Sequence, residues 1–445
     1  MTFNEFLGLV MLFSMMGVIF IGFPISFTLL FLAFIFGTIG VGPDQTFYLA
    51  YLQVWGTMKD DILPAVPLFI FMGYMTEQAG LMERLFGALR SLLAPVRGSL
   101  YLAVLLTATI FAMATGIVGA AVTVLGIMAA PMMIRTGYDA RLSAGAIAAG
   151  GTLGILIPPS VMLVVMGPTI GVPVNMLYSA AFGPGFLLAG MYIVYCMTRS
   201  FWNPALGPPV PKEERVGNAW LVIKEVLIGM LPLAALIGFT LGTILAGLAT
   251  PTEAASCGAF GATVLALLYG RLTPTALKNA AVATMVTSSM VMLLVVSSNV
   301  FGAVFTKLGT ASVITNALVG LPLPDIWKLA LIMFLIFVLG WPFEWPAIVL
   351  VFLPIFLPVV EKLNFGMSKL DMLIWFGTLV AVNLQTAFLS PPVAMSAYYL
   401  KNVVPQWSLS TIYKGMADYM VIQILCLLAL MFWPEIALWL PKVLK

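Results

Sequence analysis

The sequence predicts an all-α polytopic membrane protein built from two repeats of inverted topology. Of its 445 residues, 62% are hydrophobic and 8% are charged, whereas soluble proteins have about 45–50% apolar and about 25% charged residues. A membrane-spanning helix needs about 20 apolar residues, so the chain has room for many of them. Glycines and prolines recur in matching order in the two halves, and they interrupt the apolar stretches at equivalent places. These observations indicate a duplicated membrane protein with broken helices.

Several function classes are excluded by composition. Histidine is absent, and the three cysteines lie far apart in apolar runs. Histidine-dependent metalloproteases and Ser-His-Asp triads are therefore excluded, and the cysteines give neither a zinc spacing nor a disulfide framework. No nucleophile and base pair is evident, so we expect no enzyme activity. The net charge of +3 is small, and we expect no nucleic-acid partner.

The duplication is seen in prolines and glycines of the two halves, which correspond at a nearly constant offset of about 230 residues. Pro24 corresponds to Pro251, and Pro158-Pro159 corresponds to Pro391-Pro392. A polar loop at 200–218 separates the two halves. With 40 glycines and 29 prolines some coincidences are expected, but the matches keep chain order, which favours a true internal repeat.

Each half is expected to contain the same series of segments. Two spans are followed by a third, with an extra amphipathic piece at 45–58 in the first half. An amphipathic segment comes next, then two apolar legs, a stretch broken by Pro-Pro and a closing span. In the first half the segments are 6–22, 24–41, 62–79, 81–95, 99–115 with 118–135, 142–157 with 160–175, and 178–198. In the second half they are 225–247, 251–269, 280–306, 309–321, 325–340 with 346–361, 370–389 with 393–404, and 415–438.

The paired legs are interpreted as a re-entrant hairpin whose tip lies at mid-membrane, at 115–119 and 340–346. Legs of about 16 residues reach about 24 Å, less than a hydrocarbon core of about 30 Å. Two ordinary spans with a short turn are the alternative. With re-entrant hairpins each half has five crossings, and this odd number inverts one half relative to the other. Every arginine then lies inside, in agreement with the positive-inside rule, and both termini are predicted to face outward.

Four breaks are thus expected within the membrane, namely the two tips and the two Pro-Pro interruptions at 150–160 and 383–393. Non-helical backbone is tolerated at that depth where it is buried or lines a cavity. Proline frees a carbonyl one turn earlier because it lacks an N–H. One break alone is read more simply as a packing kink. Four breaks in matching positions favour a transport site, with helix N-termini for an anion and backbone oxygens for Na⁺.

Polar groups in apolar surroundings are few. Glu253, in the motif TPTEAA, is interpreted mainly as a helix-start residue. Glu344 at the second tip is either a tip-stabilising carboxylate or a cation ligand. Ser298 and Asn299 interrupt an apolar span and form either interhelical hydrogen bonds or substrate contacts. Because histidine is absent and buried acids are few, Na⁺ is favoured over protons as the coupling ion.

Four stretches carry a family resemblance: RTGYD at 135–139, GTLGILIPPS at 151–160, TPTEAA at 250–255 and NLQTAFLSPP at 383–392. With these motifs the chain resembles, over essentially its whole length, the large membrane subunit of TRAP (tripartite ATP-independent periplasmic) transporters, the DctM type. The resemblance implies the elevator architecture of the ion-transporter superfamily. It also implies Na⁺-coupled import of a small organic anion, a carboxylate or sulfonate, across the bacterial inner membrane. Two partners are implied, a periplasmic substrate-binding protein and a separate small membrane subunit of four helices.

Carried onto this sequence, the resemblance implies two Na⁺ sites and no organic cofactor. One Na⁺ would lie between the first tip and the first break, the other between the second tip and the second break, and the substrate between the tips. The candidate Na⁺ ligands are Thr115, Gly116, Gly119, Gly154, Ile157 and Pro159 at the first site, and Gly340, Asn383, Thr386 and Leu389 at the second. The candidate substrate contacts are Thr152, Ser160, Ser298, Asn299, Glu344 and Ser390.

The chain is accordingly expected to divide into scaffold and transport segments. Scaffold helices and arms occupy 1–98 and 225–324, transport elements occupy 99–177 and 325–404, and the closing spans occupy 178–224, with the inter-repeat cytoplasmic loop, and 405–445. Two other functions stay open: a stand-alone Na⁺/dicarboxylate or citrate-type carrier, and a non-transporting membrane assembly subunit. A requirement for a secreted binding protein would distinguish the leading function from both.

Overall fold

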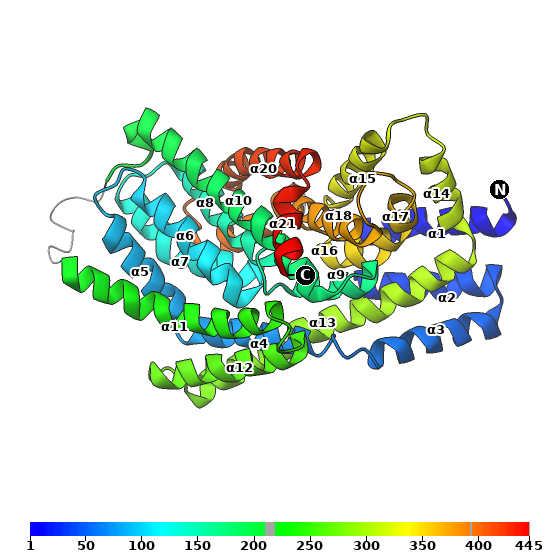
Figure 1. The fold of residues 1–445 in the computed structure, drawn as a ribbon, viewed down its shortest axis with the longest axis horizontal. Helices are drawn as coiled ribbons and strands as arrows, with labels where there is room; N and C mark the ends of the chain where they lie inside the picture. The colour runs from blue at the N-terminus through cyan, green and yellow to red at the C-terminus, as the bar shows by residue number, and fades with distance from the viewer. Residues whose placement is uncertain (210–218, 392–393, 445) are drawn as a thin grey trace.

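The computed structural model describes residues 1–209, 219–391 and 394–444, and the regular elements of these residues are all helical (Figure 1). The predicted all-α fold is therefore confirmed. Eight helices among the described residues are long and apolar enough to cross a membrane. The described residues also include shorter apolar helices of 10–17 residues, as expected where apolar stretches are broken within the membrane.

Helices of the first half follow the predicted segments closely. They are α1 (Phe3–Phe20), α2 (Ile25–Gly40), α3 (Pro43–Met58), α4 (Ala65–Gln78), α5 (Leu81–Leu93), α6 (Ser99–Thr115), α7 (Val118–Arg135), α8 (Ala140–Thr152), α9 (Val161–Ile170) and α10 (Val174–Trp202). The extra helix expected at 45–58 is α3. The first tip separates α6 from α7, and the first Pro-Pro break separates α8 from α9.

Helices of the second half follow the same order along the chain as those of the first. They are α11 (Ala219–Leu245), α12 (Pro251–Leu268), α13 (Pro274–Lys307), α14 (Thr310–Val319), α15 (Asp325–Leu339), α16 (Trp345–Ala347), α17 (Leu353–Val360), α18 (Lys369–Leu384), α19 (Met395–Val403), α20 (Leu409–Phe432) and α21 (Glu435–Leu444). The second tip lies between α15 and α16, and the second break between α18 and α19. The inverted orientation of the halves across a membrane stays a prediction.

The predicted closing span at 415–438 is wrong in its bounds. The chain leaves helical geometry at Trp433, where φ is −127° and ψ is 77°, so α20 ends before it and α21 begins after it. Pro434 explains the break, because its ring disfavours a helical conformation of the preceding residue. The short α21 then packs against α10 (Figure 1).

The leg after the second tip is also not a single regular helix. A π-helical turn, Ile348–Phe352, lies between α16 and α17. Pro354 lacks the N–H that would bond the Leu350 carbonyl in an α-helix, and this lost bond accompanies the wider turn. Wider turns of this kind occur mostly as single insertions in α-helices and often near functional sites.

The helix-start interpretation of Glu253 is confirmed. The Thr250 N–H donates to Glu253 Oε2 over 2.8 Å, and the Glu253 N–H donates to Thr250 Oγ1 over 3.3 Å. This reciprocal capping box satisfies two N–H groups at the start of α12. The Thr252 hydroxyl also donates to the Asp61 carbonyl over 2.7 Å. The TPTEAA motif therefore begins a helix and fixes it to the segment that precedes α4.

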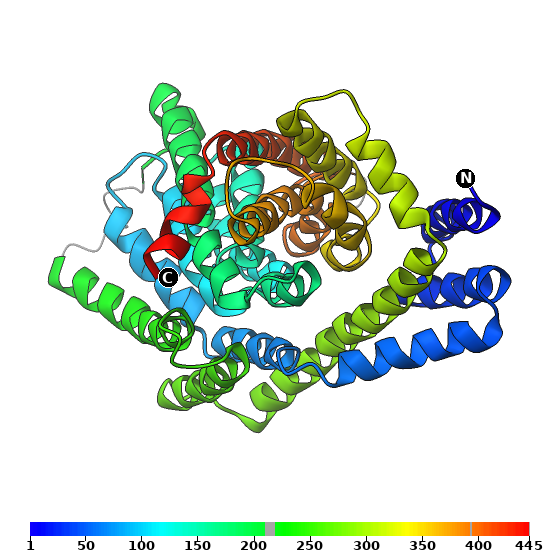
Figure 2. The same cartoon turned by 45° about the vertical axis from the view of Figure 1, so that its right-hand side comes forward.

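The helices form two groups, as Figures 1 and 2 show. In the outer layer, α13 packs against α2, α3 and α4, α12 against α4, and α11 against α5 and α12; α1 and α14 lie at one end. In the inner body, α8 packs against α6, α7 and α20, while α10 packs against α6, α18, α20 and α21; α9, α15, α16, α17 and α19 complete it. We refer to these groups as the outer layer and the inner body. Each group takes helices from both halves of the chain.

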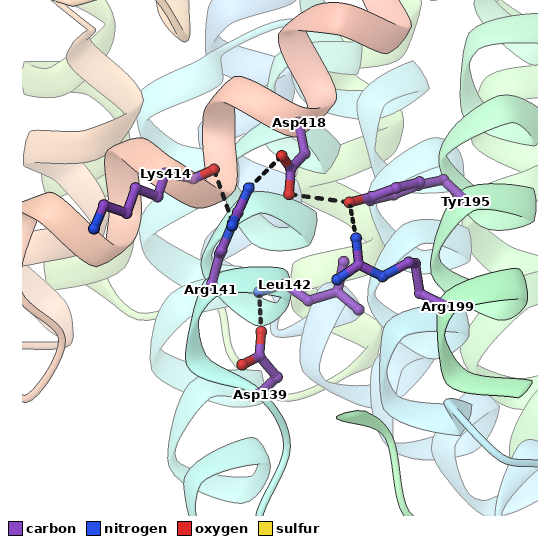
Figure 3. Close-up of polar contacts among 7 residues, drawn as sticks. All are labelled: Asp139, Arg141, Leu142, Tyr195, Arg199, Lys414 and Asp418. Atoms are coloured by element: carbon purple, nitrogen blue, oxygen red, sulfur yellow. Dashed lines mark hydrogen bonds and ion pairs between the residues drawn. The ribbon is translucent and has the colours of Figure 1, made fainter. Parts of the chain in front are cut away.

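A polar network joins three helices of the inner body at the start of α8 (Figure 3). Arg141 donates through Nη2 to Asp418 Oδ1 over 2.5 Å and through Nε to the Lys414 carbonyl over 3.2 Å. The Tyr195 hydroxyl donates to Asp418 Oδ2 over 3.0 Å and accepts from Arg199 Nη1 over 3.1 Å. The network links α8 and α10 of the first half to α20 of the second.

Asp418→Asn is expected to lower the free energy of unfolding by less than about 1 kcal/mol, because half-exposed ion pairs contribute little. The side chains of Arg141 and Asp418 are 47% and 23% exposed. Thermal unfolding in detergent, in a double-mutant cycle with Arg141→Gln, would measure the pair. Losses that add fully in the double variant would show that the two side chains do not interact.

Candidate functional site

The first tip packs backbone to backbone against the first break. Gly116 ends α6 with φ of +60°, a left-handed conformation that favours glycine. A Cβ at this position would lie 3.4 Å from the Pro159 carbonyl oxygen and 3.8 Å from that of Gly154. Both oxygens therefore face the tip. Oxygens of this kind, at a helix break, are the ligands that Na⁺ takes in transporters.

Two further candidates belong to the same region. Ile157 is fully buried in the break itself, and the side chain of Thr115 lies outside what the structure describes. Ser160 is the N-cap residue of α9, and its hydroxyl donates to the Ile155 carbonyl over 2.5 Å. Tyr178 of α10 donates to the Ser160 carbonyl over 3.3 Å. These contacts hold the break in its non-helical path.

The second tip packs against the second break in the same manner. A Cβ at Gly340 would lie 3.0 Å from the Ala387 Cβ. The Asn383 amide donates to the Met333 carbonyl over 2.7 Å, whereas its buried Oδ1 has no partner among the described residues. The Thr386 hydroxyl donates to the Asn383 carbonyl over 2.6 Å. Leu389 is buried and its N–H bonds back to the Thr386 carbonyl.

An unpartnered buried amide oxygen is costly, so Asn383 Oδ1 is the clearest free ligand atom at the second break. Sequence reasoning missed its neighbour Gln385. This side chain is fully buried, and both of its polar atoms lack partners among the described residues. The available signal was an amide within an apolar stretch, two residues after Asn383.

A cavity of about 260 Å³ lies between the two tips, and we call it the inter-tip cavity. Both breaks also contribute to it, and one wall comes from α4 and α13 of the outer layer. It is lined by Ile70, Gly116, Ile117, Val118, Gly119, Ile155, Val161, Thr287, Met290, Val291, Glu344, Trp345, Pro346, Phe388, Met395 and Tyr399. The cavity is therefore lined by both halves of the chain and by both helix groups.

Three of the residues predicted to form the site line this cavity, namely Gly116, Gly119 and Glu344. The hydroxyls of two others bond within their own segments: Thr152 donates to the Ala149 carbonyl over 2.8 Å, and Ser390 to the Thr386 carbonyl over 2.8 Å. In this structure both hydroxyls are therefore bonded to backbone carbonyls of their own segments.

Ser298 and Asn299 lie elsewhere. Both line a second cavity of about 460 Å³, formed by α3, α13 and the helical segments that follow the second tip. The Asn299 amide donates to the Thr57 hydroxyl over 3.0 Å, which joins α13 to α3. This bond matches the interhelical interpretation of the pair. The Ser298 hydroxyl is buried and has no partner among the described residues.

Sequence reasoning also missed the aromatic wall of the inter-tip cavity. Trp345, Phe388 and Tyr399 contribute it from α16, the second break and α19. The ring of Tyr399 lies directly on the first tip, since a Cβ at Gly119 would be 2.9 Å from Tyr399 Cζ. No local sequence pattern predicts this contact, because it joins residues from opposite halves of the chain.

Comparisons with known proteins agree with the architecture. The family model of the tripartite ATP-independent periplasmic transporter DctM component matches residues 12–436. The C4-dicarboxylate TRAP transporter large permease protein DctM of Pseudomonas aeruginosa is 28% identical, over 90% of this chain and 90% of that protein. The isethionate TRAP transporter permease protein DctMQ of Oleidesulfovibrio alaskensis is 30% identical, over 76% of this chain and 52% of that protein. The crystal structure of the YdaH transporter of Alcanivorax borkumensis shares the fold, with a TM-score of 0.63 at 15% identity, covering 90% of this chain and 89% of that one.

Proposed function

This chain belongs to the DctM family of tripartite ATP-independent periplasmic transporter components, a multi-pass inner-membrane protein, and we propose that it is the transport subunit of a Na⁺-coupled importer. It takes a small organic anion, a carboxylate or sulfonate, from a periplasmic binding protein. The inner body then carries the anion inward past the outer layer by an elevator movement. The observation that supports this proposal best is the cavity lined by both tips and both breaks, with one wall from the outer layer.

The cavity has features suited to a small acid. Helices α7, α9 and α19 all begin at its wall, with Val118, Val161 and Met395 as their first residues. The N-terminal ends of helices carry unsatisfied N–H groups and a partial positive charge, which attract anions. A volume of about 260 Å³ is just below the range of about 300–1,000 Å³ typical of small-molecule sites. The C4-dicarboxylate and isethionate named for two relatives are acids of that size class.

The first proposed Na⁺ site borders this cavity through Gly116, and the second lies at the second break. The first uses the carbonyl oxygens of Gly154 and Pro159 near Gly116. The second uses Asn383 Oδ1, whose amide bonds the Met333 carbonyl of α15, the helix before the second tip. Because each ion would join a tip to a break, Na⁺ binding would complete the walls of the substrate site. This is a direct physical route by which the ion and the substrate can favour each other's binding.

The proposed partners are a periplasmic binding protein and a separate small membrane subunit. This chain covers only 52% of the fused isethionate permease DctMQ, which leaves room there for a second component. Exposed apolar side chains such as Phe27, Phe31 and Tyr51 of the outer layer are surfaces for lipid or for such a subunit.

Uptake by proteoliposomes tests the function. The chain, reconstituted with its small subunit and supplied with the binding protein and a labelled small acid, is expected to accumulate the acid only with an inward Na⁺ gradient. Accumulation without a binding protein would instead indicate the stand-alone carrier, and no accumulation under any gradient would favour the assembly subunit.

The second Na⁺ site has its own test. Thr386→Ala removes the hydroxyl that bonds the Asn383 carbonyl. It is expected to raise the Na⁺ concentration for half-maximal uptake about fivefold, since one such bond is worth about 1 kcal/mol. Thr386→Ser keeps the hydroxyl and serves as the matched control. An unchanged Na⁺ dependence in the alanine variant would argue against this site.

A further inference from the structure

Glu344 stands out because it is the only charged residue among the described residues that line the inter-tip cavity. It occupies the N-cap position of α16, and yet its side chain accepts no capping hydrogen bond. No other described residue forms an ion pair or side-chain hydrogen bond with its carboxylate. Acidic groups in such apolar surroundings are functional by default, so this carboxylate is available for a ligand.

Three aromatic side chains line the inter-tip cavity together with Glu344. Trp345 is its chain neighbour, Phe388 comes from the second break, and Tyr399 comes from α19; all three line the same cavity. Aromatic faces attract cations, and several of them together are the usual recognition device for substituted ammonium groups. Glu344 thus adds a carboxylate to a wall that already suits an organic cation.

A plain dianion is poorly matched to this wall. No lysine or arginine appears among the described lining residues, and the Glu344 carboxylate would repel a second negative charge placed near it. The positive ends of α7, α9 and α19 can hold one acid group. The wall formed by Glu344 and the aromatic rings then suits a positively charged group of the same substrate.

Resting on the proposed function, we infer that the transported acid is a zwitterion: a small carboxylate or sulfonate that also carries an ammonium group, preferably an alkylated one. Its acid group lies toward the helix N-termini, and its ammonium group lies against Glu344, Trp345 and Tyr399. The second negative charge typical of a dicarboxylate is thereby selected against.

Matched pairs of compounds test this directly. Glycine betaine and 3,3-dimethylbutyrate differ by a nitrogen for a carbon, and taurine and isethionate differ by an ammonium for a hydroxyl. Binding of all four to the full chain in lipid nanodiscs, at constant Na⁺, would be measured by titration calorimetry. The ammonium-bearing member of a pair is expected to bind at least about tenfold more tightly, as a desolvated cation on aromatic and anionic groups should.

Glu344→Gln is expected to bring that ratio close to one, while Glu435→Gln, which changes an exposed carboxylate of α21, should leave it unchanged. Equal binding of both members by the wild-type protein, or binding of neither compound in any pair, overturns the inference. If Glu344→Gln instead abolishes Na⁺ dependence and keeps the ratio, the carboxylate serves the ion and the inference fails. The proposed importer function then still stands, because Na⁺-driven uptake is measured separately.

Discussion

Gly415→Ala is expected to leave little folded protein, because it forces α8 and α20 apart. An added Cβ would lie 2.1 Å from the Arg141 carbonyl oxygen and 3.0 Å from the Gly145 nitrogen. Both are backbone atoms, so no side-chain rotation can relieve the overlap. Overpacking of a close contact costs about 1–3 kcal/mol and occasionally more. Because this overlap is with backbone atoms, we expect a cost of about 3 kcal/mol or more.

The measurement is the yield of monodisperse protein after detergent extraction, together with its unfolding temperature. Gly190→Ala in α10 is the matched control, because nothing lies within 4 Å of a Cβ at that position. Alanine favours a helix over glycine by about 1 kcal/mol, so the control is expected to be neutral or slightly more stable. Wild-type stability of the Gly415 variant would mean that the two helices are not packed as closely as the structure shows.

This contact illustrates what the sequence could and could not reveal. The helix bounds followed from apolar lengths and from proline and glycine, which act locally, and most helices lie within a few residues of the predicted segments. The helix break at Trp433-Pro434, which the prediction missed, also has a local cause, since Pro434 is visible in the sequence. In contrast, nothing near Gly145 or Gly415 indicates that they meet, because small residues mark close approach but not the partner.

The same distinction applies to the site. The tips and breaks were predicted because glycine and proline interrupt apolar runs, and the structure places Gly116, Gly119 and Glu344 around one cavity. Tyr399 and the outer-layer residue Thr287 were not predicted, since their helices show no unusual local pattern. Their role depends on how the halves pack, and a single sequence carries that information only weakly.

Gly119→Ala is expected to reduce transport by about tenfold or more while leaving the protein folded. A Cβ here would lie 2.9–3.2 Å from three atoms of the Tyr399 ring, and a ring, unlike a backbone, can move aside. Its displacement changes the wall of the inter-tip cavity, to which both residues belong. Misplacement of a group by about 1 Å in a site can cost on the order of 100-fold in rate, so a smaller shift of the ring accounts for the expected loss.

A double-mutant cycle separates this effect from general damage. Tyr399→Leu removes the ring and is expected to lower uptake by itself, but Gly119→Ala should then add almost nothing, because the atoms it displaced are gone. Residues in contact typically show coupling of about 0.5–3 kcal/mol, whereas distant ones are additive. Uptake in proteoliposomes, normalised to the amount of folded protein, gives the four values. A full additional loss in the double variant would contradict the contact, and would locate the importance of Gly119 in the backbone of the first tip.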